Sequence, residues 1–226
     1  MKKGFTLAEV LITLGIIGIV AALTMPSLIV NYQKKQTAVR LEKAYAELTQ
    51  AVKLSEVDNG YVDDWDYTIG GKEFYDKYLK DYFKNVSFMP ASEYMTSLTY
   101  KNLNGSNANN SIIFNDTYAF MLANGTILYL PVVAGNFQVI YVDINGFAGP
   151  NIFGKDMFLL NIQPKYGVTP YGFGDVYTGS TTVDTSFGFE YDRDAIKNLC
   201  TKTSSGLYCA ALIIVDGWEI KDDYPW

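Results

Sequence analysis

The sequence of 226 residues contains no histidine. This absence excludes Ser-His-Asp and Cys-His catalytic groups, histidine-rich zinc sites and acid–base catalysis by imidazole. Carboxylates are plentiful, but no two of them stand in a recognisable catalytic motif. We therefore expect a protein that is not an enzyme.

Cysteine is almost absent as well, because only Cys200 and Cys209 occur. In a cytosolic protein they would be two unrelated thiols, whereas outside the cytoplasm they would form a disulfide. Their spacing is too wide for a CxxC redox motif. We favour a structural disulfide, and closing a loop of about ten residues stabilises a fold by roughly 3 kcal/mol.

Positive charge is scarce in most of the chain. Residues 1–60 carry seven basic and five acidic side chains, whereas residues 61–226 carry eleven and nineteen. An acidic globular part argues against nucleic acid as a partner, because binding it in bulk needs a basic surface. Aromatic residues make up 15% of the chain, which is enough for a core and argues against disorder.

Residues 5–30 are almost wholly apolar. As a helix these 26 residues span about 39 Å, against about 30 Å for the core of a bilayer. The alternatives are a cleaved secretory signal and a simple anchor, but the end of the run fits an A-x-A cleavage site poorly. We expect the helix to be retained. Glu9 stands out in it, because an ionisable group in a membrane segment indicates a function.

Residues 31–60 continue the helix with one apolar face. Its apolar positions are spaced by three and four residues: Ala38, Leu41, Tyr45, Leu48 and Val52. Asp58, Asn59 and Gly60 form a good C-terminal stop. The pattern predicts one helix from about Phe5 to Val57, whose second half needs a globular domain to pack against.

The segment KKGFTLAEVLITLGIIGIVAALTMP closely resembles the prepilin signal of type IV pilins and type II secretion pseudopilins. It joins a short basic leader, a Gly-Phe junction, a glutamate five residues after the glycine, and a proline at the far end of the apolar run. The resemblance implies a leader of residues 1–4, a transmembrane and assembly helix of residues 5–30, its amphipathic continuation over 31–60, and an extracytoplasmic globular domain over 61–226.

In that family a membrane-embedded prepilin peptidase cleaves after the glycine, here Gly4, and methylates the new N-terminal residue, here Phe5. The other partners that the resemblance implies are neighbouring pilin or pseudopilin subunits and the assembly platform of the inner membrane. Lys2 and Lys3 favour a cytoplasmic leader by the positive-inside rule. We expect a single-pass protein of the bacterial inner membrane, with its C-terminal domain in the periplasm or outside the cell.

The resemblance also assigns Glu9 a physical role. Cleavage creates a charged amine on Phe5, four residues earlier, and the two charges can partly neutralise each other in a lone subunit. In a filament, the family implies, Glu9 pairs with the Phe5 amine of a neighbouring subunit. This charge pair penalises a wrong register between subunits more than it adds to their affinity for one another. Gly15, Gly18 and Pro26 weaken the helix, which either kinks like an ordinary membrane helix or loosens during assembly.

The globular part favours an α+β fold. Residues 72–84 place aromatic and leucine side chains at helical spacing, which predicts a helix with a core-packing face. Asn124 and Gly125 separate two apolar, β-prone runs over residues 118–130, which predicts a hairpin. Residues 137–144 and 157–162 are predicted to be further strands, and 102–111 a surface loop. We expect an antiparallel sheet packed against the long helix, as in the pilin fold.

The connection between the last two strands is rich in oxygen-bearing side chains. Asp143, Asn145, Asn151 and Asp156 lie close together in the sequence, with three glycines that permit a tight wrap. Hard oxygen ligands on a flexible loop suit calcium, and the segment loosely resembles the calcium-binding loop of major pseudopilins. It is not an EF-hand, because no glutamate closes it. The simpler alternative is a glycine- and asparagine-rich connection without a metal, and we expect no other cofactor.

Residues 164–192 are expected to form a long connection with short strands, and 209–215 either a strand or a short helix ended by Gly217. The C-terminal sequence resembles the disulfide-bounded region of many pilins. The resulting hypothesis is a non-enzymatic subunit of a type IV filament-like assembly, with a type II secretion pseudopilin favoured. The alternatives are a subunit of an adhesive, motility or DNA-uptake pilus, and an anchored binding module that does not polymerise.

Overall fold

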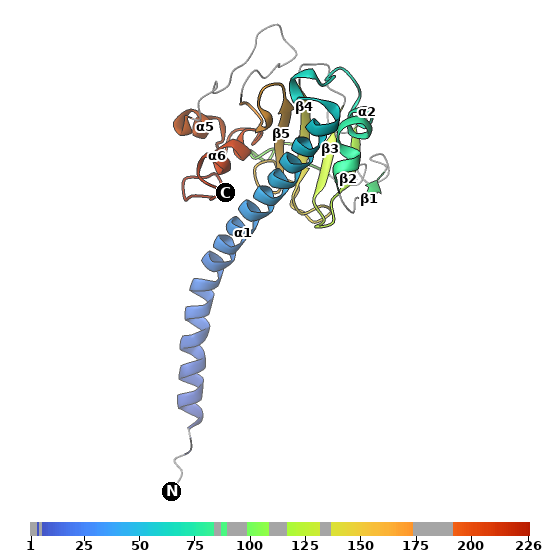
Figure 1. Cartoon of the computed structure of the whole chain (residues 1–226). Helices are drawn as coiled ribbons and strands as arrows, with labels where there is room; N and C mark the ends of the chain where they lie inside the picture. The colour runs from blue at the N-terminus through green and yellow to red at the C-terminus, as the bar shows by residue number, and fades with distance from the viewer. Residues whose placement is uncertain are drawn as a thin grey trace. The chain divides into compact units, whose positions relative to one another are not determined.

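The computed structural model describes residue 4 and residues 6–83, 87–89, 99–108, 117–131, 137–173 and 192–226. The chain divides into two compact units, Met1–Gln36 and Thr37–Trp226, each of which is described by itself. The fold class is α+β, as expected, with a long N-terminal helix and an antiparallel sheet (Figure 1). The C-terminal region contains a disulfide.

Helix α1 (Leu7–Asn59) confirms the predicted long helix and ends two residues later than expected. Its buried face within the second unit follows the predicted spacing and also includes alanines: Ala38, Leu41, Ala44, Leu48, Ala51 and Val52. Tyr45 is half-buried, and its hydroxyl donates to the carbonyl of Val168 at 2.9 Å. Gly60 ends the helix with a φ of 80°, which a residue with a Cβ rarely adopts.

Within the described residues the sheet is a six-stranded antiparallel meander, in which each strand pairs with the next one along the chain. Its strands are β1 (Ser87–Met89), β2 (Tyr118–Met121), β3 (Ile127–Leu130), β4 (Gln138–Asp143), β5 (Met157–Gln163) and β6 (Gly167–Pro170). Strands β2 and β3 confirm the predicted hairpin. Its turn bends at Gly125, which has a φ of 86°, and Asn124 Oδ1 accepts a hydrogen bond from the amide of Thr126 at 2.9 Å.

Both faces of the sheet are covered. One face packs into the same core as the buried residues of α1, through Leu128, Ile140, Val142, Phe158 and Leu160. The opposite face forms a second core in which Tyr129, Tyr141, Met157 and Leu159 contact Tyr100 and Phe153. Strands β3, β4 and β5 are therefore buried along their whole length, which explains why their sequences are nearly continuous in apolar residues.

The predicted helix over 72–84 is a run of short helical turns. It consists of α2 (Gly71–Phe74), a π-helical turn (Tyr75–Leu79) and a 3₁₀ turn (Lys80–Tyr82). Its core-facing side chains are buried as expected, with Phe74 and Tyr78 packed against Trp65. A further 3₁₀ turn (Val62–Asp64) links α1 to this region. Residue 84 lies outside the described residues.

The C-terminal region contains two short helices, α5 (Arg193–Leu199) and α6 (Cys209–Val215), which lie near the β5 side of the sheet (Figure 1). Residues 209–215 are thus a helix and not a strand, and Gly217 follows it with a φ of 73°. Helix α5 was not predicted. Arg193 donates to both oxygens of Asp216, at 2.5 and 2.8 Å, and also to Asp223 at 2.9 and 3.0 Å, which ties the last residues to α5.

The predicted surface loop and the predicted short strands of residues 164–192 agree with the structure where it describes them. Residues 102–107 form a closed turn in which Lys101 pairs with Asn107, whereas 109–111 lie outside the described residues. Strand β6 is one of the short strands expected within 164–192. Residues 174–191 of that connection also lie outside the described part.

Candidate functional site

The N-terminal end of α1 contains the residues that the prepilin resemblance singles out. Gly4 is exposed, and a Cβ added to it would meet no other atom within 4 Å. Phe5 lies outside the described residues, so the structure does not place the predicted methylation site. Helix α1 begins at Leu7, directly after Thr6, which accepts the first helical hydrogen bond from the amide of Val10.

Glu9 forms a capping box with Thr6. Its Oε2 accepts from the Thr6 amide at 2.8 Å and from the Thr6 hydroxyl at 2.9 Å, while the Glu9 amide donates back to that hydroxyl at 3.3 Å. In this arrangement a threonine before the helix and a glutamate three residues later satisfy each other's amide groups. The interaction was not predicted, although its signal, Thr-x-x-Glu before an apolar run, is present in the sequence.

The first unit exposes apolar side chains on all sides of the helix. Its most apolar window of 18 residues has a mean hydropathy of 2.3 and none of it is buried. The exposed large side chains are Leu7, Val10, Leu11, Ile12, Leu14, Ile16, Ile17, Ile19, Val20, Leu23, Met25, Leu28, Ile29 and Val30. The helix is long and apolar enough to cross a membrane, which agrees with membrane anchoring.

Gly15, Gly18 and Pro26 lie inside this continuous helix. A Cβ at either glycine would meet no atom within 4 Å, so nothing in a single chain requires glycine there. Their proposed contribution to a kink or to loosening stays a prediction.

In the loop that joins β4 to β5, two of the four predicted calcium ligands, Asn145 and Asn151, contact a third, Asp156. The carboxylate of Asp156 accepts from the amides of Asn151 at 2.7 Å and Ile152 at 2.6 Å, and from Asn145 Nδ2 at 3.2 Å. Asp143 lies at the other end of the loop, where its Oδ1 accepts from the amide of Asn145 at 3.2 Å. Asn151 is held with a φ of 57°, a conformation that asparagine tolerates better than most residues.

Both carboxylates are buried, with Asp143 1% and Asp156 4% exposed. Burial and the nearby charge of Asp156 raise the pKa of Asp143 well above its usual value. Burial also raises the pKa of Asp156, although the amides of Ile152 and Asn151 oppose the shift. Asp143 Oδ2 further accepts from the hydroxyl of Tyr100 at 3.3 Å, and that hydroxyl lies 3.0 Å from the hydroxyl of Tyr129.

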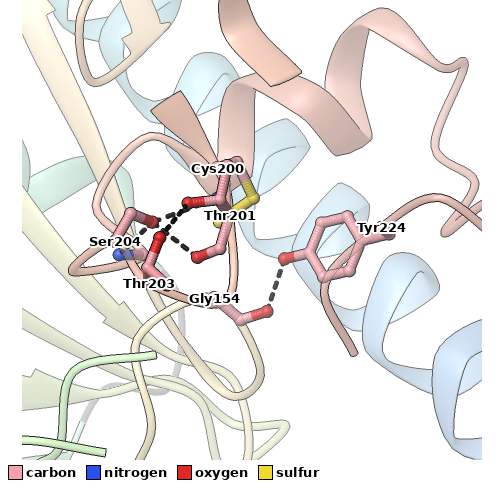
Figure 2. Close-up of a disulfide and its surroundings, with 8 residues drawn as sticks. Gly154, Cys200, Thr201, Thr203, Ser204 and Tyr224 are labelled. Carbon is pink, nitrogen blue, oxygen red and sulfur yellow. Dashed lines mark hydrogen bonds between the residues drawn. A yellow bond between two sulfur atoms is a disulfide. The ribbon is translucent and has the colours of Figure 1, made fainter. Parts of the chain in front are cut away.

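The loop is joined to the C-terminal region next to the disulfide (Figure 2). The hydroxyl of Tyr224 donates to the carbonyl of Gly154, and a Cβ at Gly154 would lie 3.1 Å from Cys209 Sγ. Cys200 and Cys209 form the predicted disulfide, with a sequence separation of 9 residues. In the loop between them, Ser204 Oγ donates to the carbonyl of Thr201 at 2.8 Å (Figure 2).

The N-terminal segment contains a type IV pilin-like signal. The model of the prokaryotic N-terminal methylation motif matches residues 1–25, which include Gly4, Phe5 and Glu9. The model of a family of unknown function (DUF6613) matches residues 27–226, and the chain belongs to this family. No curated protein and no solved structure matches the chain.

Proposed function

We propose that the protein is a structural subunit of a type IV filament-like assembly, made as a precursor and processed between Gly4 and Phe5. A prepilin peptidase removes residues 1–4 and methylates Phe5. The processed subunit then stays in the bacterial inner membrane, with its globular unit in the periplasm. The assembly platform adds it to a filament of similar subunits.

The apolar surface of α1 is the observation that carries this proposal. Fourteen large apolar side chains between Leu7 and Val30 are exposed in the single chain, and exposed apolar surface of this extent indicates a membrane or a partner. A bilayer covers it before assembly, and the helices of neighbouring subunits cover it in the filament. The methylation motif at residues 1–25 supports this use over that of a simple anchor.

Glu9 then has one role in the single subunit and another in the filament. In the single chain its carboxylate caps the first turn of α1 through Thr6. In the filament, we propose, the same carboxylate meets the new amine of Phe5 on a neighbouring subunit. An unpaired carboxylate among apolar helices is costly, so a subunit added in the wrong register is disfavoured.

The filament that we favour is a type II secretion pseudopilus. The acidic balance of residues 61–226 supports a secretion pseudopilus over a DNA-uptake pilus, because a DNA receptor needs a basic surface. Neighbouring genes provide the discriminating observation. Secretion-channel genes indicate a pseudopilus, whereas an assembly ATPase together with a retraction ATPase indicates an adhesive or motility pilus.

The test is co-expression of the full chain with a prepilin peptidase, followed by intact-mass measurement and crosslinking in the native membrane. We expect loss of the four leader residues, one added methyl group and a ladder of crosslinked subunits. Removal of a longer segment, or none, contradicts the processing site. A processed chain that crosslinks only as a monomer indicates an anchored binding module.

Two substitutions at Glu9 separate its capping role from its charge. Glu9→Gln keeps an oxygen that can accept from Thr6 and removes the charge, whereas Glu9→Val removes both. We expect both variants to be cleaved normally and both to be excluded from filaments. Thr6→Ala is the matched control, since it removes a capping partner, costs about 1 kcal/mol of helix stability and leaves the charge. If Glu9→Gln assembles like the parent, the charge is not required.

A further inference from the structure

An open groove lies beside α1 in the second unit. Its volume is about 430 Å³, which falls in the range of sites for small ligands. Helix α1 lines one side of the groove, and Trp218, which follows α6, lines the other. The lining residues of α1 recur at spacings of three and four, so they form one stripe about 16 Å long. They are Glu42, Tyr45, Ala46, Thr49, Gln50 and Lys53.

Trp218 has an unusual main-chain conformation at the edge of this groove. Its φ is 63°, which a bulky residue rarely adopts because its side chain then crowds the main chain. Strain of this kind persists only where the surrounding structure enforces it, and it occurs often at ligand sites. On either side of Trp218, Asp216 and Lys221 form an ion pair at 2.7 Å, and Asp216 also accepts from Arg193. The segment is therefore fixed at both ends before a ligand binds.

The rings of Trp218 and Tyr45 together form an aromatic platform. Their centroids are 5.3 Å apart and their planes differ by 55°, so the two rings touch and leave no room for a ligand group between them. This geometry disfavours a quaternary ammonium ligand, which an aromatic cage surrounds on several sides. Both side chains are half-buried. The part of the platform that faces the groove suits the flat apolar face of a ligand ring.

Two polar side chains in the same groove are available to a ligand. Glu42 and Gln50 are exposed, and within the described residues neither side chain forms an ion pair or a hydrogen bond. The amide of Gln50 both donates and accepts, whereas the carboxylate of Glu42 only accepts. Lys53 contributes no unpaired positive charge, because its Nζ lies 2.8 Å from Glu56 Oε2. The lining residues therefore favour a neutral ligand that donates hydrogen bonds over an acidic one.

We infer that this groove binds a neutral saccharide. A sugar ring has a flat face of C–H groups and hydroxyl groups around its edge, and the groove matches both features. The C–H face packs on Trp218, while the hydroxyl groups donate to Glu42 and exchange hydrogen bonds with Gln50. The length of the stripe on α1 admits a short oligosaccharide. The inference does not depend on the filament role.

A proline-rich peptide is the competing ligand, because such peptides also dock in grooves lined by aromatic side chains. Two features of the groove disfavour it. A run of prolines has no main-chain N–H group, so it offers no donor to the carboxylate of Glu42. Its carbonyl groups need donors from the protein, but the hydroxyl of Tyr45 already donates to the carbonyl of Val168 at 2.9 Å.

The test is isothermal titration calorimetry on the full chain in lauryldimethylamine oxide, a detergent without a sugar headgroup. The neutral probes are maltose, cellobiose, lactose and chitobiose, and the two other probes are digalacturonic acid and deca-proline. We expect saturable binding of a neutral disaccharide at millimolar concentration. Absence of binding by all the neutral disaccharides overturns the site. Tighter binding of digalacturonic acid overturns its preference for a neutral ligand, and binding of deca-proline alone makes it a peptide site.

Three substitutions assign the binding to this groove. Trp218→Ala removes the platform and should weaken binding at least tenfold, but Trp218 also packs against the core. Glu42→Gln and Gln50→Ala change exposed side chains, so the fold should stay intact, and each should weaken binding about three- to tenfold.

Two matched controls lie outside the groove. Glu47→Gln removes the same charge as Glu42→Gln from a position of α1 that lines a different groove. Trp226→Phe changes another half-buried tryptophan. Both controls should bind like the parent. Parental affinity in Glu42→Gln and in Gln50→Ala, or an equal loss in Glu47→Gln, overturns the assignment to this groove.

Discussion

Removal of the Cys200–Cys209 disulfide should destabilise the globular unit by an amount that the structure allows us to work out. The bond closes a loop with a sequence separation of 9 residues. In the chain-entropy model, a closed loop of about ten residues corresponds to about 2.7 kcal/mol at 25 °C. For a chain of this size that loss lowers Tm by roughly 5–10 °C. The expected result is a cooperative transition at lower denaturant concentration.

The assay is equilibrium unfolding in guanidinium chloride, followed by tryptophan fluorescence. The double variant Cys200→Ala/Cys209→Ala is compared with the parent, with and without a reductant. Both sulfur atoms are buried, since Cys200 is 2% and Cys209 0% exposed, so the variant should lose somewhat more than the reduced parent because two small cavities remain. The reductant should not affect the double variant.

Two results would refute this reasoning. Equal unfolding free energies for parent and double variant, within about 0.5 kcal/mol, would show that the loop is held by its other contacts, such as the packing of Gly154 against Cys209. Alkylation of both cysteines in protein taken from the cell envelope without a reductant would show that the bond does not form there. That outcome would also contradict a periplasmic location for the globular unit.

Two further predictions concern stability alone. Burial would raise the pKa of Asp216, but hydrogen bonds from Arg193 and Lys221 outweigh it and lower the pKa, while Arg193 and Lys197 lower the pKa of Asp223. A carboxylate whose pKa is lowered in the folded state stabilises the fold above about pH 4, and this stability is lost as pH falls through the folded pKa. In melts from pH 5 to pH 2, the Tm of the parent should therefore fall more steeply than the Tm of Arg193→Gln. Parallel curves would contradict this. Leu48 is fully buried in α1, so Leu48→Ala should lower the free energy of unfolding by about 2–5 kcal/mol in denaturant. Leu54 is exposed, so Leu54→Ala should lower it by less than about 0.5 kcal/mol. Equal losses for the two variants would contradict the packing described.

The parts of the fold that were predictable from sequence are those specified by local patterns. The spacing of Ala38, Leu41, Leu48 and Val52 indicates one helical face whatever packs on it, and Asn124 with Gly125 indicates a turn whatever the strands pair with. The prepilin signal is equally local. The capping box of Thr6 and Glu9 is local too, and a search for Thr-x-x-Glu would have found it.

Other features of the fold depend on contacts between segments far apart in the sequence, so no local pattern predicts them. The second core forms because Tyr100 and Phe153 reach the face of the sheet opposite α1. Likewise, the burial of Asp143 follows from the pairing of β4 with β3 and β5, where it lies opposite Ile127 and Met157. The sequence indicated four oxygen-bearing side chains close together, but not that the carboxylates are buried or that, within the described residues, two amide oxygens have no donor.

The division of α1 between two units keeps the filament role of the first unit separable from the stability of the second. The first residue of α1 that is buried within the chain is Thr37, at the start of the second unit, whereas nearly all the side chains before it are exposed. Changes at Glu9 should therefore alter assembly without altering the melting of the globular unit. Changes at buried Asp143 should alter melting without altering cleavage at Gly4. If Glu9→Gln shifted the Tm of the globular unit, the two units would be coupled in a way that their separate packing does not predict.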